Sequence, residues 1–558
     1  MRADSRAAWA ALVDEYQAAA FAHSPTQATA AGIHEYDDRL DDRSRAHLEA
    51  RVAELGRFLE RLVRLERTTL PPDDAVDAEA LELEVRAALF ESTVVRGWEK
   101  NPMGYASLPG RAIDGLIKRD FAPRQVRLRS VIARLDGIES VFAAGRANLL
   151  RPPREFTDLA INLARGSVGF FAGAVALWAK EAAGGDARLL AGFQAANGRA
   201  IESVKEFARW LQEEQLPRSD GAYAIGEEAF LEKLRLEEMI DLPLPELLAR
   251  GEAQLAEDRA AFLTLGDKLA PGKTPAEVAK LLSDDHPTAE GLLAAVSSSV
   301  EEARRFAVAQ GLITFPSEER VRVAETPPYA RNGGLASMEP PGPFETRARE
   351  AYYYVTPVED DWDAARKEAH LRHFNLPAMA CINMHEAYPG HYAQFLYRPL
   401  LPTKARKLLG CTSNDEGWAH YCEQMMVDQG FGGDDPRVRL GQLGLALVRD
   451  CRHVAGIKLH TQGMTVAQAT QLFEQQAFLP PSVAFEEARR GTYDPTYLYY
   501  TLGKLMIQDL ARDYRQAKGA TLKQFHDAFL AQGGLQIPLI RRLLDCSGPV
   551  LQRKKPGQ

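Results

Sequence analysis

Two histidines and a glutamate lie close together in the segment His-Glu-Ala-Tyr-Pro-Gly-His at residues 385–391. Imidazole nitrogens bind zinc, and a carboxylate beside a metal-bound water can take the proton of that water. His385 and His391 are six residues apart, or about 240° around a regular helix, so an undistorted helix cannot direct both at one ion. The proline and the glycine between them favour a kink or bulge that brings His391 back beside His385. The segment therefore predicts a metal site with Glu386 as the general base.

A third ligand is expected from the segment Asp-Glu-Gly-Trp-Ala-His-Tyr-Cys-Glu at residues 415–423. A catalytic zinc site usually has three protein ligands and one open position. Glu416 is the predicted third ligand. His420 and Glu423 lie four and seven residues further on the same helical face, so either could bind the ion instead, or orient a ligand from behind.

At these residues the chain resembles the bacterial family called domain of unknown function 885, whose motif reads His-Glu-x-x-Pro-Gly-His followed by Glu-Gly-Trp-x-x-Tyr. The resemblance runs nearly end to end, from residues 24–37 to residues 497–504. That family is in turn similar to helical, gluzincin-type zinc peptidases such as oligopeptidases, angiotensin-converting enzyme and thermostable carboxypeptidases. The resemblance implies one zinc ion held by His385, His391 and Glu416, with Glu386 as the general base.

The chain also departs from this family's pattern. Tyr392 stands where the family often has a second histidine, and His460 is kept from an Asp-x-Gly-x-His element whose aspartate is absent. Asp-Pro-Thr at 494–496 replaces a frequent Pro-Gly-Gln. Substrate preference therefore transfers poorly from the family.

A peptidase mechanism needs a hydrogen-bond donor for the tetrahedral oxyanion in addition to the metal. The candidates are Tyr497, Tyr499 and Tyr500, which are close together near the carboxy terminus, and His460. Tyr500 and His460 are the predicted catalytic donors. Aromatic residues at this density are more often part of a packed core, which is the competing interpretation.

Three further residues are predicted to bind substrate: Tyr354, Tyr499 and Arg490. A guanidinium binds a carboxylate through two parallel hydrogen bonds, although paired surface arginines are common. The strand-like residues 352–355 could pair with an extended peptide by edge addition. The alternative is an ordinary buried strand.

Helical patterns dominate the chain. Apolar residues recur in steps of three and four from Leu48 to Leu62, and capping boxes predict helix starts at Thr274, Thr465 and Thr521. Strand signals are few, and occur at residues 320–323 and 352–355. We therefore expect a mainly α protein, a large multi-helix fold with a deep cleft and one small β-sheet, resembling helical zinc oligopeptidases and carboxypeptidases.

A Pro/Gly-rich stretch interrupts the helical pattern in the middle of the chain. It suggests a helical amino-terminal portion (1–325), a connection with a strand (326–360) and a helical portion that carries the metal site (361–558). These portions could also form one continuous domain.

The composition excludes several classes of protein. The 558 residues carry a net charge of −9, which argues against a general nucleic-acid binder. The plainest apolar run, residues 166–179, is shorter than the roughly 20 residues of a membrane span. Five cysteines without a CxxC pair, and a charged segment at residues 1–16, favour a cytoplasmic protein.

The predicted function is a zinc-dependent hydrolase, a metallopeptidase that acts on peptides. Two alternatives remain open: a zinc-dependent amidase or deacylase that acts on small amides, and a metal-free binding or scaffold protein of the same fold. Glu386 argues against the scaffold, because a structural zinc site needs no adjacent base. The composition leaves the oligomeric state open.

Overall fold

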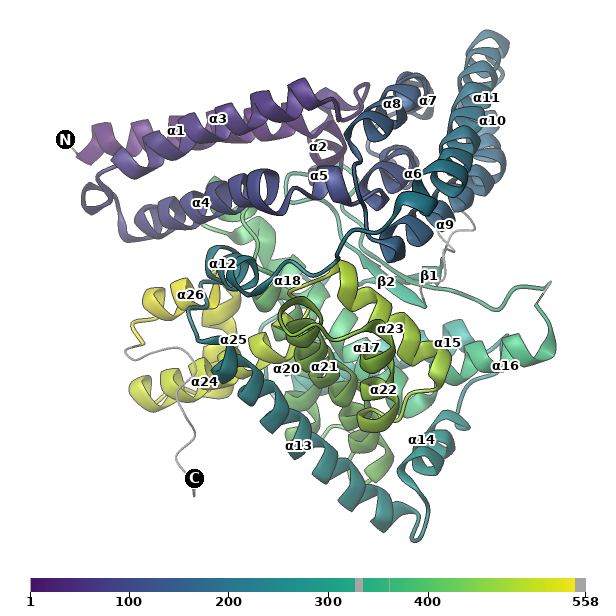
Figure 1. Ribbon diagram of the computed structural model, residues 1–558. Coiled ribbons are helices and arrows are strands. Elements are labelled where there is room, and N and C mark those ends of the chain that lie inside the picture. The colour runs from purple at the N-terminus through teal and green to yellow at the C-terminus, as the bar shows by residue number, and fades with distance from the viewer. Residues whose placement is uncertain (1, 327–334, 361, 547–558) are drawn as a thin grey trace.

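The computed structural model describes residues 2–326, 335–360 and 362–546. It is mainly helical and contains one small three-stranded sheet, which confirms the predicted class. A layer of amino-terminal helices lies across the top of a larger helical body, and the sheet lies between them (Figure 1).

The upper layer is built from the first eleven α-helices, of which α9 and α10 continue into one another through a π-helical segment, η4. Their bounds are α1 (Arg2–His23), α2 (Pro25–Ala31), α3 (Arg45–Arg64), α4 (Pro72–Phe90), α5 (Gly97–Lys100), α6 (Met103–Ile117), α7 (Arg124–Asp136), α8 (Ile138–Asn148), α9 (Arg154–Phe170), η4 (Phe171–Val175), α10 (Ala176–Ala183) and α11 (Ala187–Trp210).

The body contains the remaining α-helices, which are α12 to α15 before the sheet in the sequence and α16 to α26 after it. Their bounds are α12 (Glu227–Glu238), α13 (Leu244–Leu269), α14 (Pro275–Ser283), α15 (Leu292–Ala309), α16 (Ala364–His373), α17 (Leu376–Glu386), α18 (His391–Tyr397), α19 (Lys404–Leu408), α20 (Thr412–Asp428), α21 (Pro436–Thr461), α22 (Val466–Gln476), α23 (Pro481–Tyr493), α24 (Tyr499–Lys518), α25 (Leu522–Leu530) and α26 (Ile537–Leu543).

The sheet consists of β1 (Arg322–Glu325), β2 (Ala336–Glu339) and β3 (Tyr352–Val355) in the order β1-β3-β2. β3 pairs in parallel with β1 and antiparallel with β2. The prediction that β3 accepts a peptide along its edge is therefore wrong, because both edges of this central strand are already paired. No strand pattern in the sequence predicted β2, which lies inside the Pro/Gly-rich stretch.

The predicted helix starts are confirmed. Thr274, Thr465 and Thr521 each accept a hydrogen bond from the third residue of the helix that follows, and all three form complete capping boxes. The apolar stripe from Leu48 to Leu62 lies on α3, where Leu55 and Leu62 are buried.

The largest apolar core continues across the predicted division of the chain. Leu234, Leu247 and Ala303, from α12, α13 and α15, belong to the same cluster as Trp418 and Met506, from α20 and α24. Helices from both sides of the Pro/Gly-rich stretch therefore support the elements that carry the predicted metal ligands.

One helical segment, Arg154–Ala183, has the length and mean hydropathy, 1.4, that a membrane-crossing helix would need. It extends beyond the apolar run at 166–179. Phe171, Val175 and Ala179 on this segment are buried against the helices of the upper layer, whereas Leu177 is exposed, and 33% of the apolar window is buried. The absence of a membrane span stays a prediction.

Candidate metal centre

The turn between α17 and α18 sets the positions of the two histidines. α17 ends at Glu386, the peptide bond between Tyr388 and Pro389 is cis, and α18 begins at His391. A Cβ atom on Gly390 would lie 1.8 Å from the carbonyl oxygen of His385, so only glycine fits there. The expected kink within one helix is thus a complete break, because Gly390 has a ψ of −129°, far from helical values.

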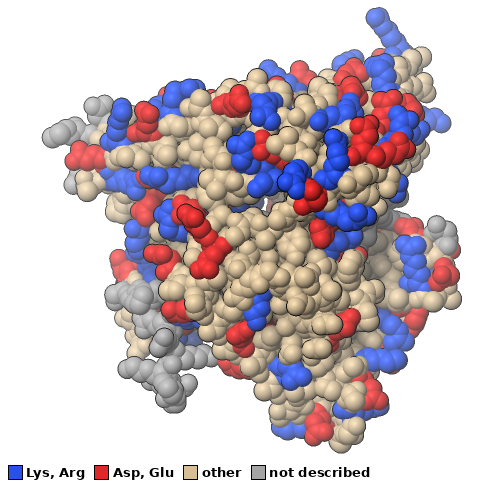
Figure 2. Space-filling model, viewed as in Figure 1, with Lys and Arg blue, Asp and Glu red and all other residues tan. Residues whose placement is uncertain are grey.

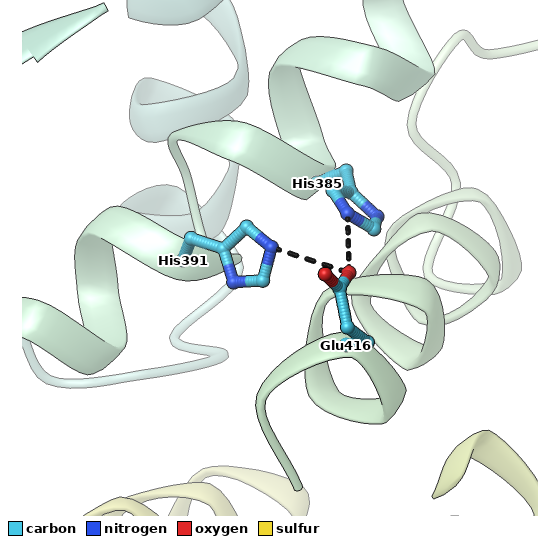
Figure 3. A group of neighbouring side chains, drawn as sticks. All are labelled: His385, His391 and Glu416. Atoms are coloured by element: carbon cyan, nitrogen blue, oxygen red, sulfur yellow. Dashed lines mark ion pairs between the residues drawn. The ribbon is translucent and has the colours of Figure 1, made fainter. Parts of the chain in front are cut away.

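Both imidazoles point at Glu416, which comes from α20 (Figure 3). Nε2 of His385 lies 3.4 Å from Oε2 of Glu416, and Nε2 of His391 lies 3.6 Å from the same oxygen. The ring planes of the two histidines are nearly perpendicular, with centroids 4.8 Å apart. The structure thus brings together the three predicted ligands from three helices.

The arrangement of these atoms fits a zinc ion. Nδ1 of His385 lies 2.7 Å from Oε1 of Glu423, and Nδ1 of His391 lies 3.3 Å from Oε1 of Gln394. In the neutral imidazoles these acceptors hold the proton on Nδ1 and leave the Nε2 lone pairs facing Glu416. Ligand atoms about 2.1 Å from a tetrahedral zinc ion lie about 3.4 Å from one another, close to the distances found here.

The electrostatics of the cluster also favour a cation. Burial raises the pKa of Glu416, but its hydrogen bonds with the two histidines hold that pKa well below the usual range. Burial lowers the pKa of His391, but Glu416, Glu386 and Asp415 together raise it to about 9. Without a metal, a proton on His391 therefore supplies the positive charge that these carboxylates attract.

Glu423 and His420 lie behind His385 and are not part of the three-ligand group. Glu423 is completely buried and bonds both Nδ1 of His385 and Nη2 of Arg449, at 2.7 Å each. Nδ1 of His420 lies 3.4 Å from the other oxygen of Glu423. This geometry is the one expected of a residue that orients His385, one of the two roles left open by the sequence.

Tyr500 lies at the edge of the cluster, with its ring centroid 6.5 Å from that of His385. Its hydroxyl accepts a hydrogen bond of 3.2 Å from Nη2 of Arg490. Burial and the charge of Glu416 raise the pKa of Tyr500, so the phenol remains protonated at neutral pH. Tyr499 instead donates to Asp494, at 2.9 Å, so its hydroxyl is already engaged.

His460 and Tyr354 are not brought to the cluster. His460 is in the last turn of α21, its Nε2 lies 2.7 Å from the carbonyl oxygen of Gly491, and its ring lines a separate pocket of about 220 Å³. The surface is hollowed near this junction of the upper layer and the body (Figure 2). The ring of Tyr354 stacks on Tyr352, 5.4 Å away, on the face of β3 opposite to Tyr353.

Several residues near the cluster were missed by the sequence analysis. Tyr353 is buried close enough to Glu386 for that carboxylate to raise its pKa further, beyond the larger effect of burial. Trp418 donates to the carbonyl oxygen of Pro389 at 2.9 Å and holds the turn against α20. The alternation of side chains along β3 could have predicted that Tyr353 points to the buried face. Gln394 comes three residues after His391, and this spacing could have predicted their contact on one face of a helix. No local pattern pointed to Arg449.

The comparisons with known proteins identify the family. A family model described as a bacterial protein of unknown function (DUF885) matches residues 25–544. The chain belongs to this family. A solved structure of a putative lipoprotein of unknown function from Shewanella oneidensis is 26% identical to the DUF885 chain, with a TM-score of 0.80. The match covers 96% of the chain and 99% of that protein.

A putative lipoprotein from Colwellia psychrerythraea has the same fold, with a TM-score of 0.82 at 17% identity, over 97% of the DUF885 chain and 99% of that protein. No curated protein matches. The predicted cytoplasmic location is contradicted by these two neighbours, both described as putative lipoproteins. That prediction relied on the charged segment at residues 1–16 and on the number and pairing of the cysteines, which proteins of other compartments can share. Similarity to zinc peptidases is not tested by these matches and stays a prediction.

Proposed function

We propose that this DUF885 protein is a zinc-dependent hydrolase that cleaves peptide bonds, with His385, His391 and Glu416 as ligands. The observation that carries the proposal is the convergence of two Nε2 atoms on one carboxylate oxygen, at 3.4 and 3.6 Å. The proposal includes the predicted deep cleft and the likeness to helical zinc peptidases. A zinc ion bound there would act as a Lewis acid toward the scissile carbonyl and its attacking water.

Glu386 is the general base of the proposed reaction. It directly follows His385 at the end of α17, and its charge acts on both His391 and Tyr353. In the reaction, Glu386 takes a proton from the attacking water and gives it to the leaving amine. It is not one of the three clustered ligand residues, which leaves its carboxylate available for this transfer.

Tyr500 is the proposed donor to the oxyanion. Because its hydroxyl oxygen accepts from Arg490, the hydroxyl proton is available to a substrate oxygen. The raised pKa of Tyr500 keeps that proton in place. A fixed donor of this kind stabilises the charge that develops in the transition state. His460 has no part in this mechanism, since its ring lines the separate pocket.

The test is metal content measured together with cleavage of a mixed peptide library. We expect about one zinc per chain in the wild-type protein and in Glu386→Gln, with activity of the variant lowered roughly 10²–10⁴-fold. His391→Ala should lose the metal as well. Glu486→Gln, on the surface of α23, is the matched control and should change neither readout. Hydrolysis of small amides without peptide cleavage would favour the amidase, and absence of zinc after zinc addition would favour the scaffold.

A further inference from the structure

Three arginines surround the ring of Tyr500. The guanidinium carbons of Arg449, Arg452 and Arg490 lie 5.9, 5.0 and 5.7 Å from the ring centroid. Such a concentration of cations beside one phenol needs compensating anions or a negatively charged ligand.

Two of these arginines have firm protein partners. Arg452 forms a two-point ion pair with Glu487, with both contacts at 2.7 Å. Arg449 binds Glu423 at 2.7 Å and the carbonyl oxygen of Leu445 at 3.1 Å. Both side chains are largely buried, so neither presents a free guanidinium edge to a substrate.

Arg490 is different. Its Nη2 alone makes the hydrogen bonds found in the described part of the chain, to Asp494 and to Tyr500, each at 3.2 Å. Asp494 also accepts from Tyr499, at 2.9 and 3.0 Å, so its charge is shared. The Arg490 side chain is 31% exposed, and its Nε and Nη1 have no acceptor among the described residues. Arg490 is thus held in place through Nη2, while the N–H groups of Nε and Nη1 are available to donate to a ligand.

The position of Arg490 relates it to the proposed reaction. The Tyr500 hydroxyl that would donate to the oxyanion is the same atom that accepts from Arg490. Consecutive Cα atoms in a peptide are about 3.8 Å apart, so a carboxylate one residue beyond the scissile carbonyl lies within reach of this guanidinium. A planar guanidinium recognises a carboxylate better than any other side chain does.

We propose that Arg490 binds the free α-carboxylate of the substrate, which makes the enzyme a carboxypeptidase that removes single residues from peptide carboxy termini. This inference rests on the proposed zinc hydrolase function. In the reaction, the oxygen of water bonds to the carbonyl carbon, the C–N bond breaks, and Glu386 carries the proton of water to the departing amino acid. Arg490 is then a specificity-determining residue whose one contact with the substrate is to the carboxylate.

The experiment compares the zinc-loaded wild-type protein with Arg490→Met, Arg490→Lys and the neighbouring Arg489→Gln. Each is assayed on pairs of peptides that end in a free carboxylate or in the corresponding amide. For the wild-type protein we expect kcat/KM to be at least 100-fold higher for the acid than for the amide. In Arg490→Met, kcat/KM for the acid substrate should fall at least 100-fold, mainly through a higher KM. The ratio of kcat/KM between acid and amide should then be below 10. Arg490→Lys should recover part of the preference for the acid substrate. Arg489 pairs with Glu486 on the surface, so Arg489→Gln should behave as wild type.

An equal loss on acid and amide substrates in Arg490→Met would overturn the inference, because it would mean that Arg490 only positions Tyr500. Equal cleavage of both substrates by the wild-type protein would also overturn it, while leaving the zinc hydrolase intact. A binding measurement separates the two proposals further. N-acetylphenylalanine should bind the zinc-loaded wild-type protein at least 10-fold tighter than its amide does, and Arg490→Met should lose that difference. No cleavage of any peptide by zinc-loaded protein would instead reject the hydrolase itself.

Discussion

Glu423 connects the candidate metal ligands to the interior of the protein. Its side chain has no exposed surface, and its carboxylate lies between His385 and Arg449. Burial raises the pKa of Glu423, but the charge of Arg449 and the hydrogen bond from His385 hold that pKa well below the usual value. The carboxylate is therefore a permanent acceptor, which fixes the orientation of the His385 ring.

We expect Glu423→Gln to weaken zinc binding by roughly 10–100-fold, because a neutral amide orients His385 less firmly and lowers the basicity of its Nε2. The affinity is measured by competition with a zinc chelator. Glu487→Gln removes a partly buried carboxylate that pairs with Arg452 and does not contact a ligand, so its zinc affinity should stay within 3-fold of wild type. Equal zinc affinity in wild type and Glu423→Gln would contradict the orienting role.

At the scale of elements, α20 and α24 cross at two glycines. A Cβ atom on Gly503 would lie 2.0 Å from the carbonyl oxygen of Ser413, and one on Gly417 would lie 2.5 Å from Cα of Gly503. The backbones can approach only because neither residue has a side chain. Glu416 precedes one glycine, and Tyr500 lies one turn before the other. The crossing therefore sets the spacing between the third ligand and the proposed oxyanion donor.

Gly503→Ala should force the two helices apart, with a loss of about 1–3 kcal/mol in the free energy of unfolding and a weaker zinc affinity. Gly198→Ala is the control, since a methyl group at that exposed position of α11 meets no atom within 4 Å. That change should stabilise the protein by about 0.5–1 kcal/mol. Chemical denaturation and chelator competition measure both effects. An unchanged stability in Gly503→Ala would show that the crossing can relax.

The elements differ in how far the sequence could predict them. Capping boxes and the stripe on α3 are local patterns, and they predicted these helices correctly. β2 has no such pattern, because its pairing with β3 is made across the intervening chain. The three clustered ligands were identified from spacing and a family motif, whereas the placement of His460 beside Gly491 depends on how α21 packs against α23. Long-range packing of this kind leaves little trace in a single sequence.

At the scale of the whole molecule, metal binding should be linked to stability through pH. The pKa of His391 is raised to about 9 in the folded, metal-free protein, against about 6.5 in an unfolded chain. A raised folded pKa contributes stability that is fully present below pH 6.5 and is lost as the pH rises through 9. Zinc needs the neutral imidazole, so its stabilising effect should grow over the same interval.

The expected outcome is that the difference in Tm between zinc-loaded and chelator-treated protein increases from pH 6.5 to pH 9. A ligand at about 1,000 times its Kd adds about 4 kcal/mol, which corresponds to a shift of a few degrees in a chain of this size. Thermal unfolding across the pH series measures it. In His391→Gln the difference should be small and independent of pH. A wild-type difference that shrinks with rising pH would contradict the assignment of His391.

The residues around the sheet also connect the upper layer to the body. Lys118, which directly follows α6, lies 2.9 Å from Glu339 of β2, Arg119 donates to the carbonyl oxygen of Glu339 at 2.6 Å, and His34 lies 3.0 Å from Glu345. Any movement that separates the two layers at this place must break these contacts. Because ion pairs near the surface weaken as dissolved salt screens them, the rate of such a movement depends on ionic strength. How firmly the upper layer holds to the sheet would then be set by the salt around the protein as much as by its own sequence.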